Sequence, residues 1–241
     1  MRSFPGRPDS RVRLSEQAWR GDEMAYRMVG ISGSPIVKGN LGTFLDSIMD
    51  TASVRGFETE TVYLQKMLVR NCTHCNYCIS RQKDGKYCSL DDDAQALYEK
   101  IEQADAIVLA SPVYFMRTSG MMATFIDRLR VFIFGNVAGG RLRNKVGISA
   151  AVSWLRHGGI ETTHLSHILA FITLDMIPAT VHSSVSPLGA SSVSSRHGEG
   201  EFDPSVRLGT CDDQAGLLSA EALVGRAVEL LDLMRKAPVT S

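Results

Sequence analysis

The chain has 241 residues, of which 44% are hydrophobic, enough to bury one core of the size that a single domain holds. Lysine and arginine together number 26, and so do aspartate and glutamate, so no global positive field exists to attract nucleic acid or an anionic membrane. No apolar run approaches the roughly 20 residues that span a bilayer, so we expect a soluble protein without a nucleic-acid or membrane partner.

Residues 1–26 differ in composition from the rest of the chain. Arginines stand among prolines and acidic residues, and the apolar segment of a secretory signal is missing. The acidic residues also count against a transit peptide. We expect a flexible or intersubunit N-terminal arm in front of one domain over residues 27–241. The five cysteines are then expected in a reducing cytoplasm, where disulfides rarely persist.

From residue 27 onward, short apolar runs alternate with amphipathic ones. AIVLASP (106–112) has the uninterrupted apolar character of a parallel strand covered on both faces, and NLGTFLDSIMDTASVRG (40–56) has helical spacing. Residues 183–202, rich in serine and glycine, are predicted to form a long loop. This alternation predicts a doubly wound α/β domain, with helices on both faces of a parallel sheet. The predicted strands are 27–32, 58–64, 106–112, 145–151 and 176–182, and the predicted helices are 40–56, 91–105, 120–135, 159–174 and 212–236.

In a doubly wound sheet the ligand crevice lies at the carboxyl ends of the strands. After the first strand comes GISGSPIVKGNLGTF, in which hydroxyl residues and glycines lead directly into a helix. Hydroxyl groups, backbone amides and a helix N-terminus suit a terminal phosphate. The order Lys38, Gly39, Asn40 is not that of a nucleoside-triphosphate loop, and the dinucleotide pattern G-x-G-x-x-G is absent. A plain tight turn is the alternative for this loop.

Two further loops follow strands at the same edge of the sheet. SPVYFMRTSG places Tyr114 and Phe115 after the third strand, where an aromatic pair either borders a flat heterocycle or caps the core. SWLRHGGIETTHL places Gly158 and Gly159 at the next helix start, where their amides either meet the carbonyl edge of the same ring or form only a turn. His157 beside them is the histidine expected near the site.

The motifs SGSPIVKGN, SPVYFMRTSGMMATFIDR and GGIETT, in that order and spacing, resemble the NADPH-dependent FMN reductase group of flavodoxin-like proteins over roughly residues 28–236. The resemblance implies a flavodoxin-like, five-stranded parallel sheet of order 2-1-3-4-5. It also implies that the first loop holds the phosphate of FMN and that the second loop carries the flavin ring. The FMN-binding residues expected in the three loops are Ser32, Ser34, Pro35, Asn40, Leu41, Gly42, Thr43, Pro112, Val113, Tyr114, Phe115, Gly158 and Gly159.

The stretch NCTHCNYCISRQKDGKYCS places Cys72, Cys75 and Cys78 at three-residue steps, with Cys88 ten residues later. Closely spaced thiolates reach three corners of a cubane from one loop while a more distant cysteine closes the fourth, so the run fits a 4Fe-4S cluster. Zinc and a structural loop of free thiols are the alternatives. With this run the chain resembles the iron-sulfur flavoproteins specifically, which implies a cysteine-rich insertion over residues 71–90.

Two other histidines share one predicted helix. His164 and His167 are three residues apart, but no third metal ligand is evident nearby, so we expect them at the surface or at an interface rather than in a metal site.

We therefore expect an FMN-dependent oxidoreductase, in which NAD(P)H or a ferredoxin-like donor reduces the flavin and a cluster passes single electrons to a redox partner protein or a small-molecule acceptor. The flavin carries the chemistry, so no catalytic triad is needed. A metal-free NAD(P)H:FMN or quinone reductase and a non-enzymatic carrier of the flavodoxin kind are the alternatives. The resemblance further implies a homodimer or homotetramer with the cysteine segment at an interface.

Overall fold

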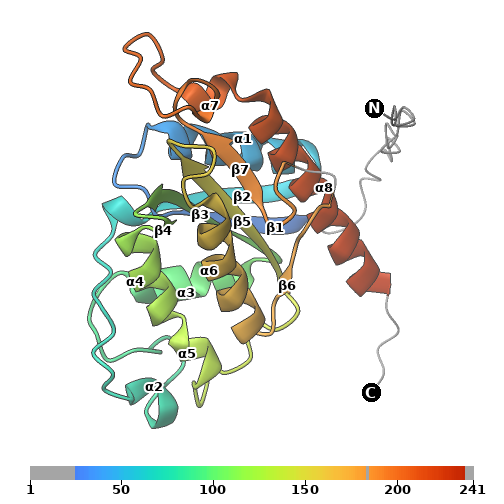
Figure 1. Ribbon diagram of the computed structural model, residues 1–241. Coiled ribbons are helices and arrows are strands. Elements are labelled where there is room, and N and C mark those ends of the chain that lie inside the picture. Colours follow the sequence, from blue (N-terminus) through green and yellow to red (C-terminus); the bar gives the residue numbers. More distant parts are fainter. Residues whose placement is uncertain (1–24, 183–184, 237–241) are drawn as a thin grey trace, which may run out of the picture.

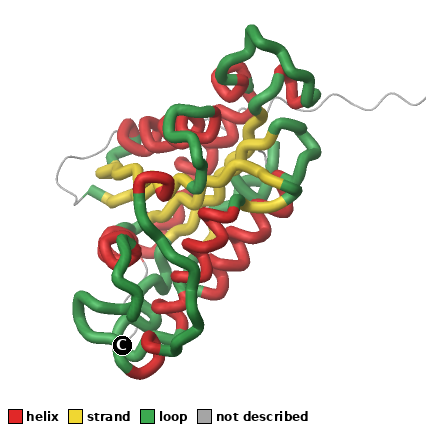
Figure 2. The backbone as a smooth tube through the Cα atoms, turned by 90° about the vertical axis from the view of Figure 1, so that its left-hand side faces the viewer, coloured by secondary structure: helices red, strands yellow, loops and turns green. Residues whose placement is uncertain are grey.

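The computed structural model describes residues 25–182 and 185–236, in which a twisted sheet lies between two layers of helices (Figures 1 and 2). The predicted N-terminal arm falls almost wholly outside these residues, and Tyr26 already begins the first strand. The strands are β1 Tyr26–Ser32, β2 Phe57–Tyr63, β3 Ala106–Tyr114, β4 Arg117–Thr118, β5 Val146–Ser153, β6 Ile177–Pro178 and β7 Ala190–Val193. The α-helices are α1 Asn40–Val54, α2 Tyr77–Ser80, α3 Ala94–Gln103, α4 Gly120–Arg128, α5 Arg130–Ile133, α6 Ile160–Thr173, α7 Gly209–Asp212 and α8 Gln214–Lys236.

The main strands form one sheet in the order β2-β1-β3-β5-β6, and every neighbouring pair in this path is parallel. This confirms the flavodoxin-like class and the predicted arrangement around the first and third strands. β1, β2, β3 and β5 all begin and end within two residues of their predicted bounds. The agreement for β1, β3 and β5 follows from their largely apolar runs, which suit a parallel sheet covered on both faces.

The edge of the sheet beside β5 differs from the prediction. The predicted strand 176–182 shrinks to the two residues of β6, and its last residue, Pro178, has no amide hydrogen to donate to the ladder. The chain then leaves the edge and returns as β7, which pairs in parallel with the carboxyl half of β5. β7 lies within residues 183–202, so the predicted long loop is wrong over this stretch. Two short strands thus share the edge that one was expected to fill.

Alternate side chains of the central strands enter two separate cores. Val29 and Ile31 of β1 pack with residues of α3, α4 and α6 on one face, whereas Met28 packs with α1 and α8 on the other. The same alternation occurs in β3, where Leu109 and Val108 face opposite layers. The two layers visible in Figure 1 are therefore set by the period of two along each strand.

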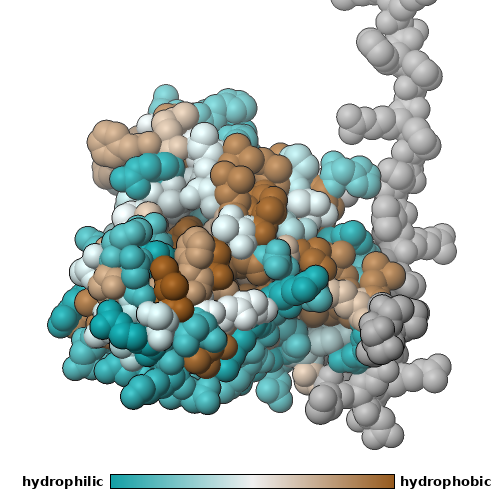
Figure 3. All heavy atoms as spheres, turned by 90° about the horizontal axis from the view of Figure 1, so that it is seen from below, coloured by the Kyte–Doolittle hydropathy of each residue, from teal (hydrophilic) through white to brown (hydrophobic). Residues whose placement is uncertain are grey.

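The predicted helix 120–135 is also divided. α4 ends at Arg128, and Leu129 (φ −66°, ψ −7°) tightens the last turn before the short α5. β4, which was not predicted, pairs antiparallel with the end of β3 and forms a hairpin in front of α4. No helix in the described ranges is long and apolar enough to cross a membrane. Exposed apolar groups on the face in Figure 3 are interrupted by polar ones.

Candidate functional site

A pocket of about 420 Å³ opens at the carboxyl ends of β1, β3 and β5. This is the edge at which a doubly wound sheet binds its ligands. Its size suits a mononucleotide-sized molecule. The residues that line it are Ser34, Ile36, Gly39, Asn40, Leu41, Pro112, Val113, Tyr114, Val152, Trp154, Ser194, Ser195, Glu201, Phe202, Asp203 and Val206.

The loop after β1 leads into the N-terminus of α1. Gly39 caps this helix without any side-chain hydrogen bond, so the backbone N–H groups of the first turn are not capped by a side chain. Gly42 approaches the loop so closely that a Cβ there would lie 2.1 Å from the Val37 carbonyl oxygen. The arrangement leaves amide donors and the positive end of the helix facing the pocket, which fits a phosphate group.

The serines of this loop hold the loop itself together. The Ser34 hydroxyl donates to the Ile36 carbonyl oxygen at 2.9 Å and accepts from the Ile36 amide at 3.0 Å. The buried Ser32 hydroxyl accepts from the Ser34 amide at 3.4 Å. Ser34 lines the pocket, whereas Ser32, Pro35, Gly42 and Thr43 do not.

Asn40 connects the first loop with a distant helix. Its side-chain oxygen accepts from the backbone amide of Thr210 in α7, at 3.2 Å. Asn40 and Leu41 line the pocket as predicted, and Asn40 retains its NH₂ group as a donor. The contact with Thr210 was not predicted, because nothing in the sequence around Thr210 indicates where α7 packs.

The loop after β3 folds back as a hairpin, with Tyr114 paired to Arg117. At its tip Phe115 and Met116 both adopt positive φ angles of 48° and 61°, and Phe115 is 99% exposed. Pro112, Val113 and Tyr114 line the pocket, whereas Phe115 does not. The structure therefore brings three of the four predicted ring-lining residues to the pocket and places the fourth at the exposed tip.

Hydrogen bonds from one serine tie the first two loops together. The Ser119 hydroxyl donates to the Gly33 carbonyl oxygen at 2.7 Å and accepts from the Met122 amide at 3.2 Å, which caps α4. The Ser119 amide donates to the Ser111 hydroxyl at 2.8 Å. Both pocket loops are thus fixed relative to α4.

The third loop contributes Trp154 rather than its two glycines to the pocket wall. Gly159 is the N-cap of α6 and has a φ of 103°, and a Cβ there would lie 2.4 Å from the Cα atom of Met116. Gly158 and Gly159 thus sit beside neighbouring backbone and do not line the pocket. The exposed His157 also lies outside the lining residues.

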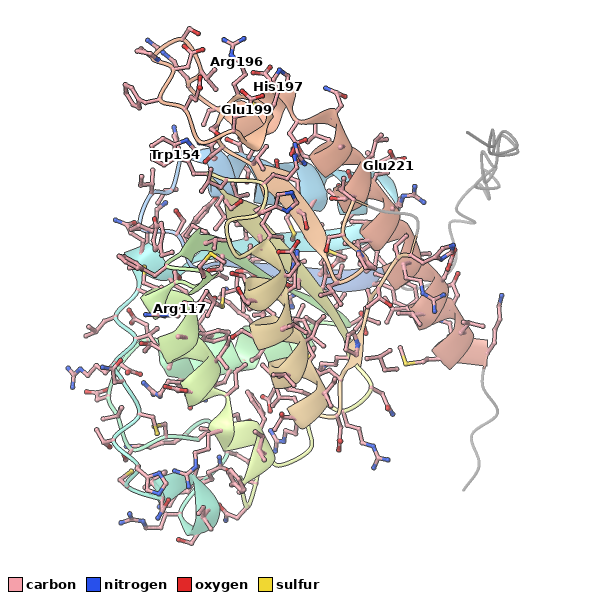
Figure 4. All side chains as sticks on the ribbon, in the orientation of Figure 1. Arg117, Trp154, Arg196, His197, Glu199 and Glu221 are labelled. Atoms are coloured by element: carbon pink, nitrogen blue, oxygen red, sulfur yellow. The ribbon has the colours of Figure 1, made fainter. Side chains whose placement is uncertain are left out.

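The outer wall of the pocket comes from residues 194–206, of which those up to 202 were predicted only as part of a loop and the rest were assigned to no element. Trp154 lies next to this segment, close to Arg196, His197 and Glu199 (Figure 4). Asp203 is held by Arg196, whose Nη2 lies 2.6 Å from a carboxylate oxygen. The pKa of Asp203 is lowered to about 2, most strongly by hydrogen bonds from Ser205 and less strongly by the hydrogen bond from Arg196. Asp203 therefore stays ionised at neutral pH.

His164 and His167 are fully buried, so the expectation of a surface or interface role is wrong. The Ser149 hydroxyl lies 2.7 Å from Nδ1 of His164 and 2.8 Å from Nδ1 of His167. The opposite ring nitrogens reach Ser191 at 2.8 Å and Thr118 at 3.1 Å. Helical periodicity cannot show this arrangement, because the hydroxyl partners come from three strands.

The four cysteines of the insertion line one shallow cavity of about 20 Å³. Cys72 and Cys75 are exposed, Cys78 is buried and Cys88 is partly buried. Burial raises the pKa of Cys78, while Arg130 opposes that rise. The pKa of Cys75 is lowered, chiefly by its 3.0 Å hydrogen bond with Ser89.

The donor chemistry of this cavity suits an anionic sulfur-rich group, because four thiols lie beside the cations Arg128 and Arg130. Arg128 also has a buried Nε atom that finds no hydrogen-bond partner among the residues that the structure describes. Within residues 25–182 and 185–236, however, no three Cys, His, Asp or Glu side chains are grouped so that they hold a metal ion. The structure gathers the four cysteines without closing them around one centre.

Comparisons with known proteins agree with the fold. Residues 26–187 match the family described as NADPH-dependent FMN reductase. An iron-sulfur flavoprotein of Methanocaldococcus jannaschii is 31% identical over 210 residues, which are 87% of this chain and 100% of that protein. One from Archaeoglobus fulgidus is 31% identical over 206 residues, which are 86% and 96% of the two chains. RosB with bound 8-demethyl-8-formylriboflavin-5'-phosphate has a TM-score of 0.70 at 16% identity, covering 90% of this chain and 83% of that chain.

The parallel sheet, its strand order and the pocket at its carboxyl edge define a flavodoxin-like protein. The likeness to RosB concerns this fold alone. The family match and the two archaeal relatives go further. The chain belongs to the NADPH-dependent FMN reductase family, and it is an FMN-dependent oxidoreductase.

Proposed function

We propose that this oxidoreductase couples FMN to a 4Fe-4S cluster and transfers electrons from NAD(P)H or a ferredoxin-like donor to an acceptor. The observation that carries the proposal is the cavity that brings together Cys72, Cys75, Cys78 and the distant Cys88. The names of the two archaeal relatives, both iron-sulfur flavoproteins, support it. A cluster supplies one-electron transfer beside a flavin that also accepts hydride.

The residues of the chain bind and orient the flavin. In the proposal, the first-turn amides of α1 and the Asn40 side-chain NH₂ hold the phosphate, which needs no cation because the helix end is itself positive. Val113, Tyr114 and Trp154 form the walls beside the ring. Ser119 fixes the two loops before any ligand arrives, so the pocket does not have to be ordered by binding.

We also propose a homodimer or homotetramer in the cytoplasm. The cysteine segment around α2 lies at the opposite end of the molecule from α7, which contacts the pocket residue Asn40 (Figure 1). This separation favours electron transfer between the cluster of one subunit and the FMN of another. Sedimentation or light scattering of the holoprotein gives a dimer or tetramer in this case, and a monomer at all concentrations contradicts it.

The first experiment measures FMN, iron and acid-labile sulfide in protein purified without oxygen, and repeats the measurement for Cys78→Ser. The expected result is bound FMN with equal iron and sulfide in the wild type, and loss of iron and sulfide with FMN retained in the variant. Cys211→Ser is the matched control, because Cys211 is exposed and lies outside the cavity. FMN without iron or sulfide, together with NAD(P)H turnover on a quinone, instead establishes the metal-free reductase.

A further inference from the structure

Arg128 is a buried cation at the wall of the cysteine cavity. Its Nη1 donates to an Asp92 oxygen at 2.6 Å and to the Arg70 carbonyl oxygen at 2.7 Å, and its Nη2 donates to the other Asp92 oxygen at 3.1 Å. Its Nε is buried without a partner among the described residues. An unpaired buried donor is costly, so this group is expected to have an acceptor that the polypeptide does not supply.

The guanidinium cannot easily turn to find another partner. Asp92 is itself held by the backbone amides of Arg70 at 3.0 Å and Ala94 at 3.2 Å. The carboxylate therefore clamps both terminal nitrogens of Arg128 in a bidentate pair. The orientation of the free Nε–H is fixed by the fold, before any ligand is present.

Arg128 lies beside the sulfurs, because it lines the same cavity as the four cysteines. Burial lowers the pKa of Arg128, but its hydrogen bonding to Asp92 raises that pKa overall, so the guanidinium stays charged. Arg130, the other cation of the cavity, is bonded to His74 at 3.1 Å and to Asn76 at 2.7 Å, and these contacts are exposed to solvent. Arg128 is thus less exposed to solvent than Arg130, and its charge is paired with that of Asp92.

We propose that Arg128 donates its Nε–H to a sulfur of the cluster held by the four cysteines, and that it thereby raises the reduction potential of that cluster. This inference rests on the proposed function. Because the charge of Arg128 is paired with Asp92, the effect comes from the hydrogen bond, which stabilises the more negative, reduced state of the cluster. Arg128 is a positioning and tuning residue here, not a ligand.

The test compares Arg128→Lys with Arg130→Lys in anaerobically purified holoprotein by redox titration. Both variants keep the positive charge, but only Arg128→Lys removes the buried Nε–H. We expect one-electron reduction of the cluster to become about tenfold less favourable in Arg128→Lys, a shift of about 59 mV to more negative potential, and to stay unchanged in Arg130→Lys. An unchanged potential in a folded Arg128→Lys protein with full iron and sulfide overturns the inference.

A second measurement does not depend on how well the lysine variant folds. Protein labelled with 15N-arginine is reduced, and pulsed electron paramagnetic resonance is used to detect 15N coupling to the cluster. Coupling that persists in labelled Arg130→Lys protein supports Arg128 as the donor, whereas its absence from the wild type overturns the inference. If the wild-type protein contains no iron and sulfide, the proposed function fails and the inference fails with it. If iron and sulfide are present but the 15N coupling is absent, only the inference fails.

Discussion

At the scale of single residues, Gly159 shows how one missing side chain lets the start of α6 pack against the hairpin tip at Met116. Its φ of 103°, and the 2.4 Å that would separate an added Cβ from the Cα atom of Met116, exclude alanine without movement of the hairpin tip. We predict that Gly159→Ala lowers the free energy of unfolding by about 1–3 kcal/mol and weakens FMN binding. Urea denaturation and FMN titration measure the two effects.

Gly120→Ala is the control for this prediction. A Cβ at Gly120 has no atom within 4 Å, and its φ is not in the left-handed region, so the variant should be as stable as the wild type. If Gly159→Ala has the same free energy of unfolding as the wild type, the hairpin tip shifts without loss of stability and the prediction is contradicted.

The buried histidine pair makes stability depend on pH. Burial lowers the pKa of His164 to about 4, and burial together with the charge of His164 lowers the pKa of His167 to about 3. The unfolded chain, with pKa values near 6.5, therefore binds more protons at acidic pH than the folded protein does. We predict that stability is full above pH 6.5 and falls as the pH is lowered toward 4, by about 2 kcal/mol per histidine at pH 5.

Urea denaturation at pH 7.5 and pH 5 checks this dependence in the wild type and in His167→Gln. The variant should lose part of the acid sensitivity, whereas His157→Gln, which changes an exposed histidine, should keep all of it. Equal pH dependence in all three proteins would contradict the role of the buried pair.

The shared Ser149 hydroxyl has only one proton, so it donates to one imidazole and accepts from the other.

At the scale of elements, α4 anchors both pocket loops through its N-cap. Ser119→Ala removes the cap and the bond to the Gly33 carbonyl oxygen. We predict a loss of about 1–2 kcal/mol in the free energy of unfolding and weaker binding of FMN, because the first loop is no longer fixed. Thermal unfolding and FMN titration are the measurements.

Ser47→Ala is the matched serine control on α1. The Ser47 hydroxyl donates only to the Thr43 carbonyl oxygen within its own helix, so its removal should change neither stability nor FMN affinity by much. If the two variants lost FMN affinity equally, the connection between α4 and the first loop would not control the pocket.

Prediction from the sequence succeeded best for elements with long, regular patterns. β3 and β5 are largely apolar because both faces of the sheet are covered, and α1 has its apolar residues on one side. The edge was predicted less well because β6 and β7 have two and four residues, too few for a pattern. The split between α4 and α5 likewise occurs without a proline or glycine that marks it.

At the scale of the whole molecule, the pocket joins segments from residue 34 to residue 206, so its ligand should stabilise the entire fold. We predict that FMN at one hundred times its dissociation constant raises the free energy of unfolding of the apoprotein by about 2.7 kcal/mol. Riboflavin, which lacks the phosphate, should stabilise less at the same concentration. Equal stabilisation by the two flavins would contradict a phosphate site at the N-terminus of α1.

By itself, the sequence determined the class of the fold, the two loops at the carboxyl edge and the grouping of the first three cysteines, because these depend on local period and spacing. Tertiary structure alone decided that residues 194–206 wall the pocket, that α7 reaches Asn40 and that His164 and His167 share a buried hydroxyl. These contacts join residues far apart in the chain. Their geometry follows from how the layers pack, and no local pattern encodes it.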